Sequence, residues 1–86
     1  MNKKEFQNKM TELGLLKKSK RMMEFKKVQY FVDQTRFFIL GYYKNKNKNF
    51  VAFFKDFERE TFKEMGEFAT EEEVYDVLVE FIENEE

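Results

Sequence analysis

The sequence predicts a two-layer α+β domain in which helices pack on one face of an antiparallel sheet. Three observations support this fold class. Amphipathic patterns occupy both ends of the chain, about four extended segments lie between them, and the connections are too short for parallel crossovers. With 86 residues, 42% of them hydrophobic, the chain suits one domain. The expected element order is α(α)ββββα.

The first helix is expected to start after Asn2 and to stop before Gly14. Phe6, Met10 and Leu13 recur at helical spacing. Asn2 has a side chain that caps helix N-termini, and glycine is a common C-terminal stop.

The segment after this helix, "LLKKSKRMMEFK" (residues 15 to 26), leaves two interpretations open. It can form a second short helix capped by Ser19, or a loop that leads into the first strand. Its apolar residues do not decide between them.

About four strands are expected from residue 27 onward, because the segments are rich in aromatic or β-branched residues and are bounded by polar turns. Their sequences are "KVQYFVD", "RFFILGYY", "NFVAFFKDF" and "TFKEMGEF". The connections "DQTR", "KNKNKN" and "ERE" are short, so the sheet should be an antiparallel meander. The asparagines of "KNKNKN" can adopt left-handed conformations. In the last strand, Phe62 and Phe68 are expected to be in phase, on the same face of the sheet, and Gly66 is expected at a bulge.

The C-terminal helix is the clearest element. Thr70 and Glu73 form a T-x-x-E capping box, and the acidic first turn complements the helix dipole. One apolar stripe should lie on the sheet: Val74, Val77, Leu78, Phe81 and Ile82.

Composition excludes most catalytic chemistry. The chain has no Cys and no His, which removes thiolate nucleophiles, the usual general base and common metal ligands. Ser19 has no His to activate it, and the three glycines are too scattered for a phosphate loop. Glu58 and Glu60 remain formally able to act as acid and base, like many other carboxylates in the chain. We expect a protein that is not an enzyme and that binds no cofactor or metal.

Charge is divided along the chain. Residues 1 to 57 contain 14 Lys or Arg and 5 Asp or Glu, whereas residues 58 to 86 contain 2 and 12. This separation produces a strong electrostatic field unless the basic and acidic parts of the chain interleave in space. The N-terminus lacks the apolar stretch of a signal peptide, and no apolar run is long enough to cross a bilayer, so we expect a cytoplasmic protein without membrane contact.

The central hairpin, "RFFILGYYKNKNKNFVAFF", has rings on both faces of its strands. One face can pack under the helices, and the other is expected to remain partly exposed for a partner protein. The rings assigned to this partner site are Tyr43, Phe50 and Phe53.

An alternative for the same hairpin is a single-stranded nucleic-acid site. Phe50 and Phe53 would stack on bases, and the loop lysines would hold phosphates: Lys44, Lys46 and Lys48. The acidic last third of the chain would repel phosphates, so a protein interface is favoured.

Four acidic residues line one stripe of the C-terminal helix, away from its apolar residues: Glu72, Asp76, Glu80 and Glu83. Like charges at this spacing cost about 0.2 to 0.5 kcal/mol per pair, so local stability does not favour the arrangement. One interpretation is a solvated face that keeps a Phe-rich protein soluble. The other is a surface complementary to a basic partner, such as a nuclease or another nucleic-acid-binding enzyme.

Residues 56 to 82 combine an acidic-arginine turn, a strand that ends in Phe and a T-E-E-E helix start. These features are Glu58-Arg59, Phe68 and Thr70 to Glu73. The segment resembles the C-terminal part of small bacterial polymorphic-toxin immunity proteins. It departs from them at Val74, where such families usually place Ala, and "KNKNKN" is not part of their pattern, so the toxin class is not carried over.

The resemblance implies a single-domain cytoplasmic protein that neutralises a toxin by occluding its active site. Acidic residues of the last helix would steer a basic toxin, and exposed rings would supply anchors. A second hypothesis is a phage- or plasmid-encoded inhibitor of a host nucleic-acid enzyme, in which the acidic face imitates a phosphate backbone. Self-association into a homodimer also remains open.

Overall fold

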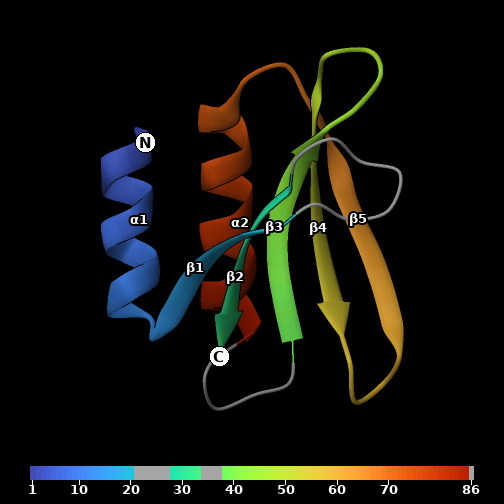
Figure 1. Ribbon diagram of the computed structural model, residues 1–86. Helices are drawn as coiled ribbons and strands as arrows, with labels where there is room; N and C mark the ends of the chain where they lie inside the picture. Colours follow the sequence, from blue (N-terminus) through green and yellow to red (C-terminus); the bar gives the residue numbers. More distant parts are fainter. Residues whose placement is uncertain (21–27, 34–37, 86) are drawn as a thin grey trace.

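The described residues form an α+β fold of two helices and one antiparallel sheet. The computed structural model describes residues 1–20, 28–33 and 38–85, with the side chains of residues 1–15, 32 and 38–84. In chain order the elements are α1 (Lys3–Glu12), β1 (Leu15–Lys20), β2 (Val28–Asp33), β3 (Phe38–Lys44), β4 (Phe50–Asp56), β5 (Thr61–Phe68) and α2 (Glu71–Glu85) (Figure 1). The predicted α+β class is confirmed.

The prediction of about four strands is wrong, because Leu15–Lys20 forms a further strand and the order is αβββββα. The sequence left this stretch open between helix and loop, since its residues follow neither period. Pairing with β2, from Leu15 opposite Asp33 to Lys20 opposite Val28, supplies interactions that a local pattern does not reveal. Residues 21–26 and most of the expected "DQTR" turn lie outside the described residues.

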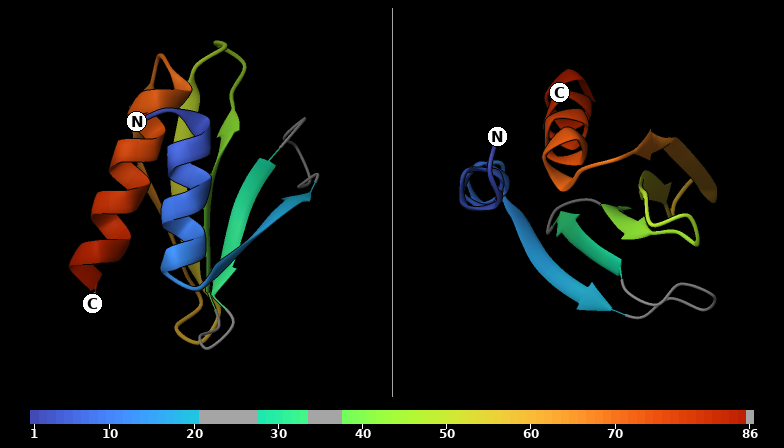
Figure 2. Two further views of the ribbon diagram at one scale, coloured as in Figure 1. Left: turned by 90° about the vertical axis from the view of Figure 1, so that its left-hand side faces the viewer. Right: turned by 90° about the horizontal axis from the view of Figure 1, so that it is seen from above.

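The sheet is the predicted antiparallel meander, with strand order β1-β2-β3-β4-β5. Both helices lie on one face of it, which is clearest in the view from above (Figure 2). α2 contacts β3, β4 and β5, whereas α1 contacts α2 and β1. The second face of the sheet carries no helix of the described chain.

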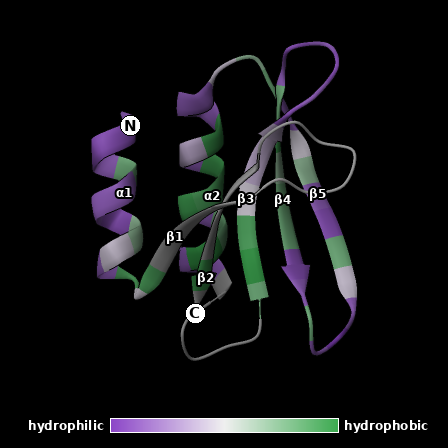
Figure 3. Cartoon of the chain, viewed as in Figure 1, coloured by the Kyte–Doolittle hydropathy of each residue, from purple (hydrophilic) through white to green (hydrophobic). Residues whose placement is uncertain are grey.

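A first hydrophobic cluster fills the space between the helices and the sheet. Its buried members are Phe6, Met10, Leu15, Phe38, Leu40, Tyr42, Ala52, Val74, Tyr75, Leu78, Val79 and Ile82. Apolar residues accordingly gather on α2, β3 and β4, while α1 is largely hydrophilic (Figure 3). The rings of Phe6 and Tyr75 stack with centroids 4.4 Å apart, which joins α1 to α2.

Both helices start at the predicted caps. Asn2 Oδ1 accepts a hydrogen bond from the backbone N–H of Glu5 at 2.8 Å, and the Glu5 side chain accepts one from the N–H of Asn2. At α2, Thr70 Oγ1 accepts from the N–H of Glu73 at 3.3 Å and donates to its carboxylate at 3.1 Å. Gly14 follows α1 with a φ of 83°, as expected of a C-terminal stop.

The predicted apolar stripe of α2 faces the sheet. Val74, Leu78 and Ile82 are buried. Val77 is half-buried at the margin of the first cluster, and Phe81 is half-buried beside Phe54 at the same margin. This margin lies beside β5, so α2 leaves part of its apolar surface open there.

β5 contains the bulge predicted near Gly66, whose φ is 131°. Met65 has no partner in β4, because the register between the two strands shifts there. The extra residue changes the face on which later side chains lie. Phe62 and Phe68 are therefore not in phase as predicted: Phe68 packs against the first cluster, and Phe62 stacks on Phe53 at the opposite face.

Candidate functional site

The four acidic residues predicted as a stripe on α2 are all exposed, and the structure divides them into two pairs. Asp76 and Glu83 are the pair that meets the N-terminal segment, Asp76 ahead of α1 and Glu83 within it. Asp76 Oδ1 lies 3.1 Å from the terminal amine of Met1, and Glu83 Oε1 lies 3.3 Å from Lys9 Nζ. The Glu83 pair links α2 to α1 and the Asp76 pair links α2 to the chain start, and exposed pairs of this kind contribute about 0.2 to 1 kcal/mol each.

Glu72 and Glu80 are the second pair, and neither makes an ion pair with another described residue. Glu72 lies in the first turn of α2, at the positive end of the helix dipole. Glu80 lies further along α2 and lines a groove between this helix and β5. Of the predicted stripe, Glu80 is thus the residue at this concave surface.

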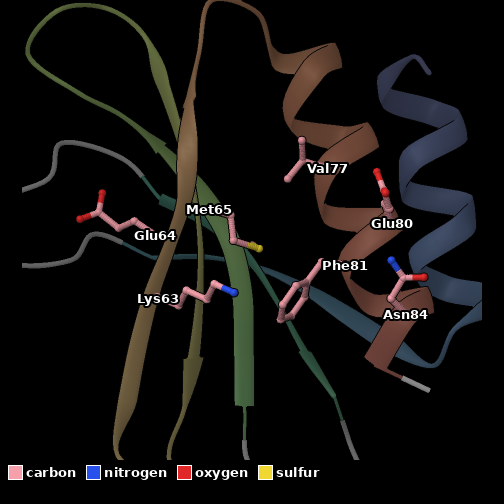
Figure 4. A pocket seen from close by; sticks show the side chains of 7 residues that line it. All are labelled: Lys63, Glu64, Met65, Val77, Glu80, Phe81 and Asn84. Carbon is pink, nitrogen blue, oxygen red and sulfur yellow. The ribbon is translucent and has the colours of Figure 1, made fainter.

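The groove is shallow and largely open to solvent, with a volume of about 360 Å³. Its lining comes from β5 and α2: Lys63, Glu64, Met65, Val77, Glu80, Phe81 and Asn84 (Figure 4). Half-buried side chains of Met65, Val77 and Phe81 form an apolar floor. The Phe81 ring is held in place by Phe54, with the two ring centroids 4.9 Å apart.

Three charged groups border this apolar floor, and two of them are already engaged. Lys63 Nζ lies 5.9 Å from the centroid of the Phe81 ring, a cation–π distance. The Glu64 side chain points away from the groove, and its Oε2 accepts a hydrogen bond from the Tyr43 hydroxyl at 3.2 Å (Figure 4). Glu80 is therefore the carboxylate of the groove that is left without a partner among the described residues.

The rings expected on the second face of the sheet are buried. Ile39, Tyr43, Val51 and Phe53 form a second hydrophobic cluster, in which Phe53 is 1% and Tyr43 is 7% exposed. The expected exposure of Tyr43 and Phe53 is therefore wrong. Neighbouring rings cover part of this surface: Phe53 stacks on Phe62 at 5.7 Å between centroids and lies 6.2 Å from Tyr43.

Phe50, the third predicted ring, is half-buried and packs against the first cluster on the helix side of the sheet. Among the rings whose side chains the structure describes, the exposed ones are instead Phe57 and Phe62, at 49% and 48%. Sequence reasoning missed both as surface residues. The available signal was their position on either side of the polar "ERE" turn.

The lysine and asparagine loop between β3 and β4 is fastened to β5. Asn45 Oδ1 accepts hydrogen bonds from the backbone N–H groups of Asn47 and Asn49, both at 3.0 Å. The side-chain amides of Asn45 and Asn49 donate to the Glu67 carboxylate at 2.8 and 2.7 Å. The left-handed residue of the loop is Lys48, with a φ of 65°, and not one of the asparagines.

The loop lysines Lys44, Lys46 and Lys48 are exposed, as the nucleic-acid alternative requires. The rings of that alternative are not equally available. Phe53 is buried, and the half-buried Phe50 ring has Lys44 Nζ 5.7 Å from its centroid. The structure therefore does not bring the predicted lysines and rings together as an open platform.

A polar cluster at the start of α2 was not predicted. The hydroxyls of Tyr42 and Tyr75 both donate to Glu71 Oε2, at 2.8 and 3.2 Å, and lie 3.4 Å from each other. Burial raises the pKa of both hydroxyls, and at Tyr42 the hydrogen bonds to Tyr75 and Glu71 add to the rise. The sequence signal was the i, i+4 spacing of Glu71 and Tyr75. The cluster satisfies buried hydroxyls and is best explained as structural.

Residues 1–20, 28–33 and 38–85 contain no group of three or more His, Cys, Asp or Glu arranged to hold a metal ion. Neither α1 nor α2 is long and apolar enough to cross a membrane. Glu58 and Glu60 are exposed in the turn after β4, and the Ser19 side chain lies outside the described ones.

No protein-family model matches the sequence, and comparisons with curated proteins and with solved structures find no significant match. A functional assignment therefore depends on the groove and on the charges around it.

Proposed function

We propose that the protein is a non-enzymatic inhibitor that binds a basic protein and occludes its functional surface. The observation that supports this most strongly is the groove between β5 and α2. There an apolar floor adjoins Glu80, a carboxylate with no ion-pair partner among the described residues. Apolar contacts at such a site provide affinity, and the carboxylate selects a cationic side chain.

The partner we propose is a toxin, in the manner of the polymorphic-toxin immunity proteins. The residues that resemble those proteins, 56 to 82, include β5 and most of α2, and hence most of the groove lining. Proteins that act on nucleic acids carry basic surfaces, which an acidic surface on an inhibitor complements. We expect the pair to meet in the bacterial cytoplasm.

The experiment is affinity purification of the tagged protein from its native host, with bound proteins identified by mass spectrometry. An immunity protein should retain the product of an adjacent gene and should restore growth to cells that produce that product. A nucleic-acid enzyme encoded elsewhere would instead support the phosphate-mimicry hypothesis. Recovery of neither kind of protein, without growth rescue, would contradict the proposal.

Direct nucleic-acid binding is tested separately, because the exposed loop lysines favour it and the burial of Phe53 weighs against it. We expect no mobility shift of single-stranded DNA or RNA at low salt. A shift that disappears when the three lysines are changed together to Glu (Lys44→Glu, Lys46→Glu, Lys48→Glu) would favour a nucleic-acid-binding module instead.

A further inference from the structure

The outer edge of β5 has no strand beside it among the described residues. β5 is the last strand in the sheet order, and no described residue forms backbone hydrogen bonds with its outer side. Residues 61 to 64 of this strand are exposed. The unpaired N–H and C=O groups of an edge strand are a template for an added strand. The bulge at Met65 interrupts the regular edge, so the template is short.

The two edges of the sheet differ in charge. β1, at the opposite edge, has the sequence "LLKKSK" with three lysines. β5 and α2 belong to the last third of the chain, in which 12 acidic residues stand against 2 basic ones. A basic segment is therefore attracted to the β5 edge and repelled from the β1 edge.

Lys63 indicates which side chain the groove accepts. Its side chain points from β5 toward Phe81, and its ammonium lies 5.9 Å from the centroid of the Phe81 ring (Figure 4). An aromatic face attracts a cation, and the apolar floor beside it suits an aliphatic stem. The same surface fits a lysine or arginine from a partner, and Glu80 on the helix wall offers a countercharge.

We propose that the partner inserts an extended basic segment into this groove as a sixth strand beside residues 61 to 64 of β5. One of its lysine or arginine side chains replaces Lys63 over the Phe81 ring and pairs with Glu80. This inference rests on the proposed function and specifies the chemistry of the docking segment. A second copy of the chain cannot fill this role with its own β5 and α2, because they carry the same acidic charge. Its lysine-containing β1 edge is the competing occupant, which the concentration test below distinguishes.

The probe for this inference is a fluorescein-labelled peptide of alternating lysine and valine, with a glutamate and valine peptide as its counterpart. Fluorescence anisotropy at low ionic strength should show binding of the lysine peptide alone. Glu80→Lys should weaken that binding about tenfold, because a cation would replace the countercharge in the groove. Glu72→Lys is the matched control: the charge change is the same on an exposed residue of α2 outside the groove, and it should weaken binding less than about threefold.

Two further measurements test the geometry. Lys63→Ala should strengthen peptide binding about two- to fivefold, because it removes a like charge and the side chain that occupies the Phe81 ring. Amide hydrogen exchange of residues 61 to 64 should slow when the peptide is bound, since strand addition pairs these groups. Circular dichroism of each variant confirms that it folds.

Equal weakening by Glu80→Lys and Glu72→Lys would overturn the inference, because it would indicate a diffuse charge effect. Unchanged exchange at residues 61 to 64 under saturating peptide would overturn strand addition. Protection of the same amides that rises with protein concentration in the absence of peptide would assign the edge to a second copy.

The failure of this inference differs from that of the proposed function. Full retention of the native partner by the Glu80→Lys protein would overturn the docking site and leave the inhibitor function in place. Absence of any native partner, with the peptide results as expected, would contradict the inhibitor function alone.

Discussion

Replacement of Glu71 by alanine should destabilise the fold far more than the same change at Glu72. Glu71 Oε2 accepts hydrogen bonds from Tyr42 and Tyr75, whose side chains are 5% and 2% exposed. Without the carboxylate, the two hydroxyls retain their mutual contact at 3.4 Å, and one of them lacks an acceptor. Hydrogen bonds to a charged group contribute about 1.5 to 3 kcal/mol each, and water can replace part of this because Glu71 is half-exposed. We expect Glu71→Ala to lower the free energy of unfolding by about 2 to 4 kcal/mol.

Glu72→Ala removes an equal charge from the same helical turn, so both variants lose the favourable interaction with the helix dipole, about 0.3 to 1 kcal/mol. Urea unfolding at neutral pH, followed by circular dichroism, measures the difference between them. Tyr42→Phe should lower the free energy of unfolding less in the Glu71→Ala background than in the parent protein, because the carboxylate that accepts the Tyr42 hydrogen bond is already absent. If the Glu71 and Glu72 variants unfold within about 0.5 kcal/mol of each other, the hydroxyls find other acceptors and the reasoning fails.

Three further predictions follow from burial and backbone geometry. The free energy of unfolding should fall as the pH rises above about 10. Tyr42 contributes about 1.4 kcal/mol per pH unit to this fall, because its pKa is raised in the folded protein and its hydroxyl therefore ionises at a lower pH in the unfolded chain. Urea midpoints between about pH 8 and 11 measure the slope, which Tyr42→Phe should reduce. Phe53→Ala should lower the free energy of unfolding by about 3 to 5 kcal/mol. Phe57→Ala, at a ring that is 49% exposed, should lower it by less than about 0.5 kcal/mol. Similar urea midpoints for the two variants would contradict the burial of Phe53. Gly66→Ala should lower the free energy of unfolding by more than about 1 kcal/mol, because the φ of Gly66 is 131° and a Cβ there would lie 3.0 Å from the Phe68 ring. An unchanged melting temperature would show that the bulge relaxes to fit the methyl group.

The elements that could be predicted are those whose cause lies within a few residues. Asn2 and Thr70 cap their helices through hydrogen bonds that span three positions, so the local sequence contains the whole interaction. β1 differs because its six residues become a strand only through pairing with β2. The same holds for Phe62, whose face depends on a bulge and on the Phe53 ring of the neighbouring strand.

The candidate site was predictable in part for the same reason. Helical spacing placed Glu72 and Glu80 on the exposed side of α2, and both are exposed. The pattern could not show that Glu83 would be paired with Lys9, since that requires the packing of α1 beside α2. Nor could it show the groove, which arises where the margin of α2 passes along β5.

The stack of Phe6 on Tyr75 has a kinetic consequence for the whole domain. Each strand pairs with its neighbour in the sequence, so the meander can assemble from short loops at low entropic cost. The ring stack joins residues 69 positions apart, and α2 supplies Val74, Tyr75, Leu78, Val79 and Ile82 to the first cluster. During synthesis on the ribosome, the sheet can therefore begin to form before α2 covers β3, β4 and β5. The helix-facing side of these strands remains open to other chains until α2 has emerged and docked.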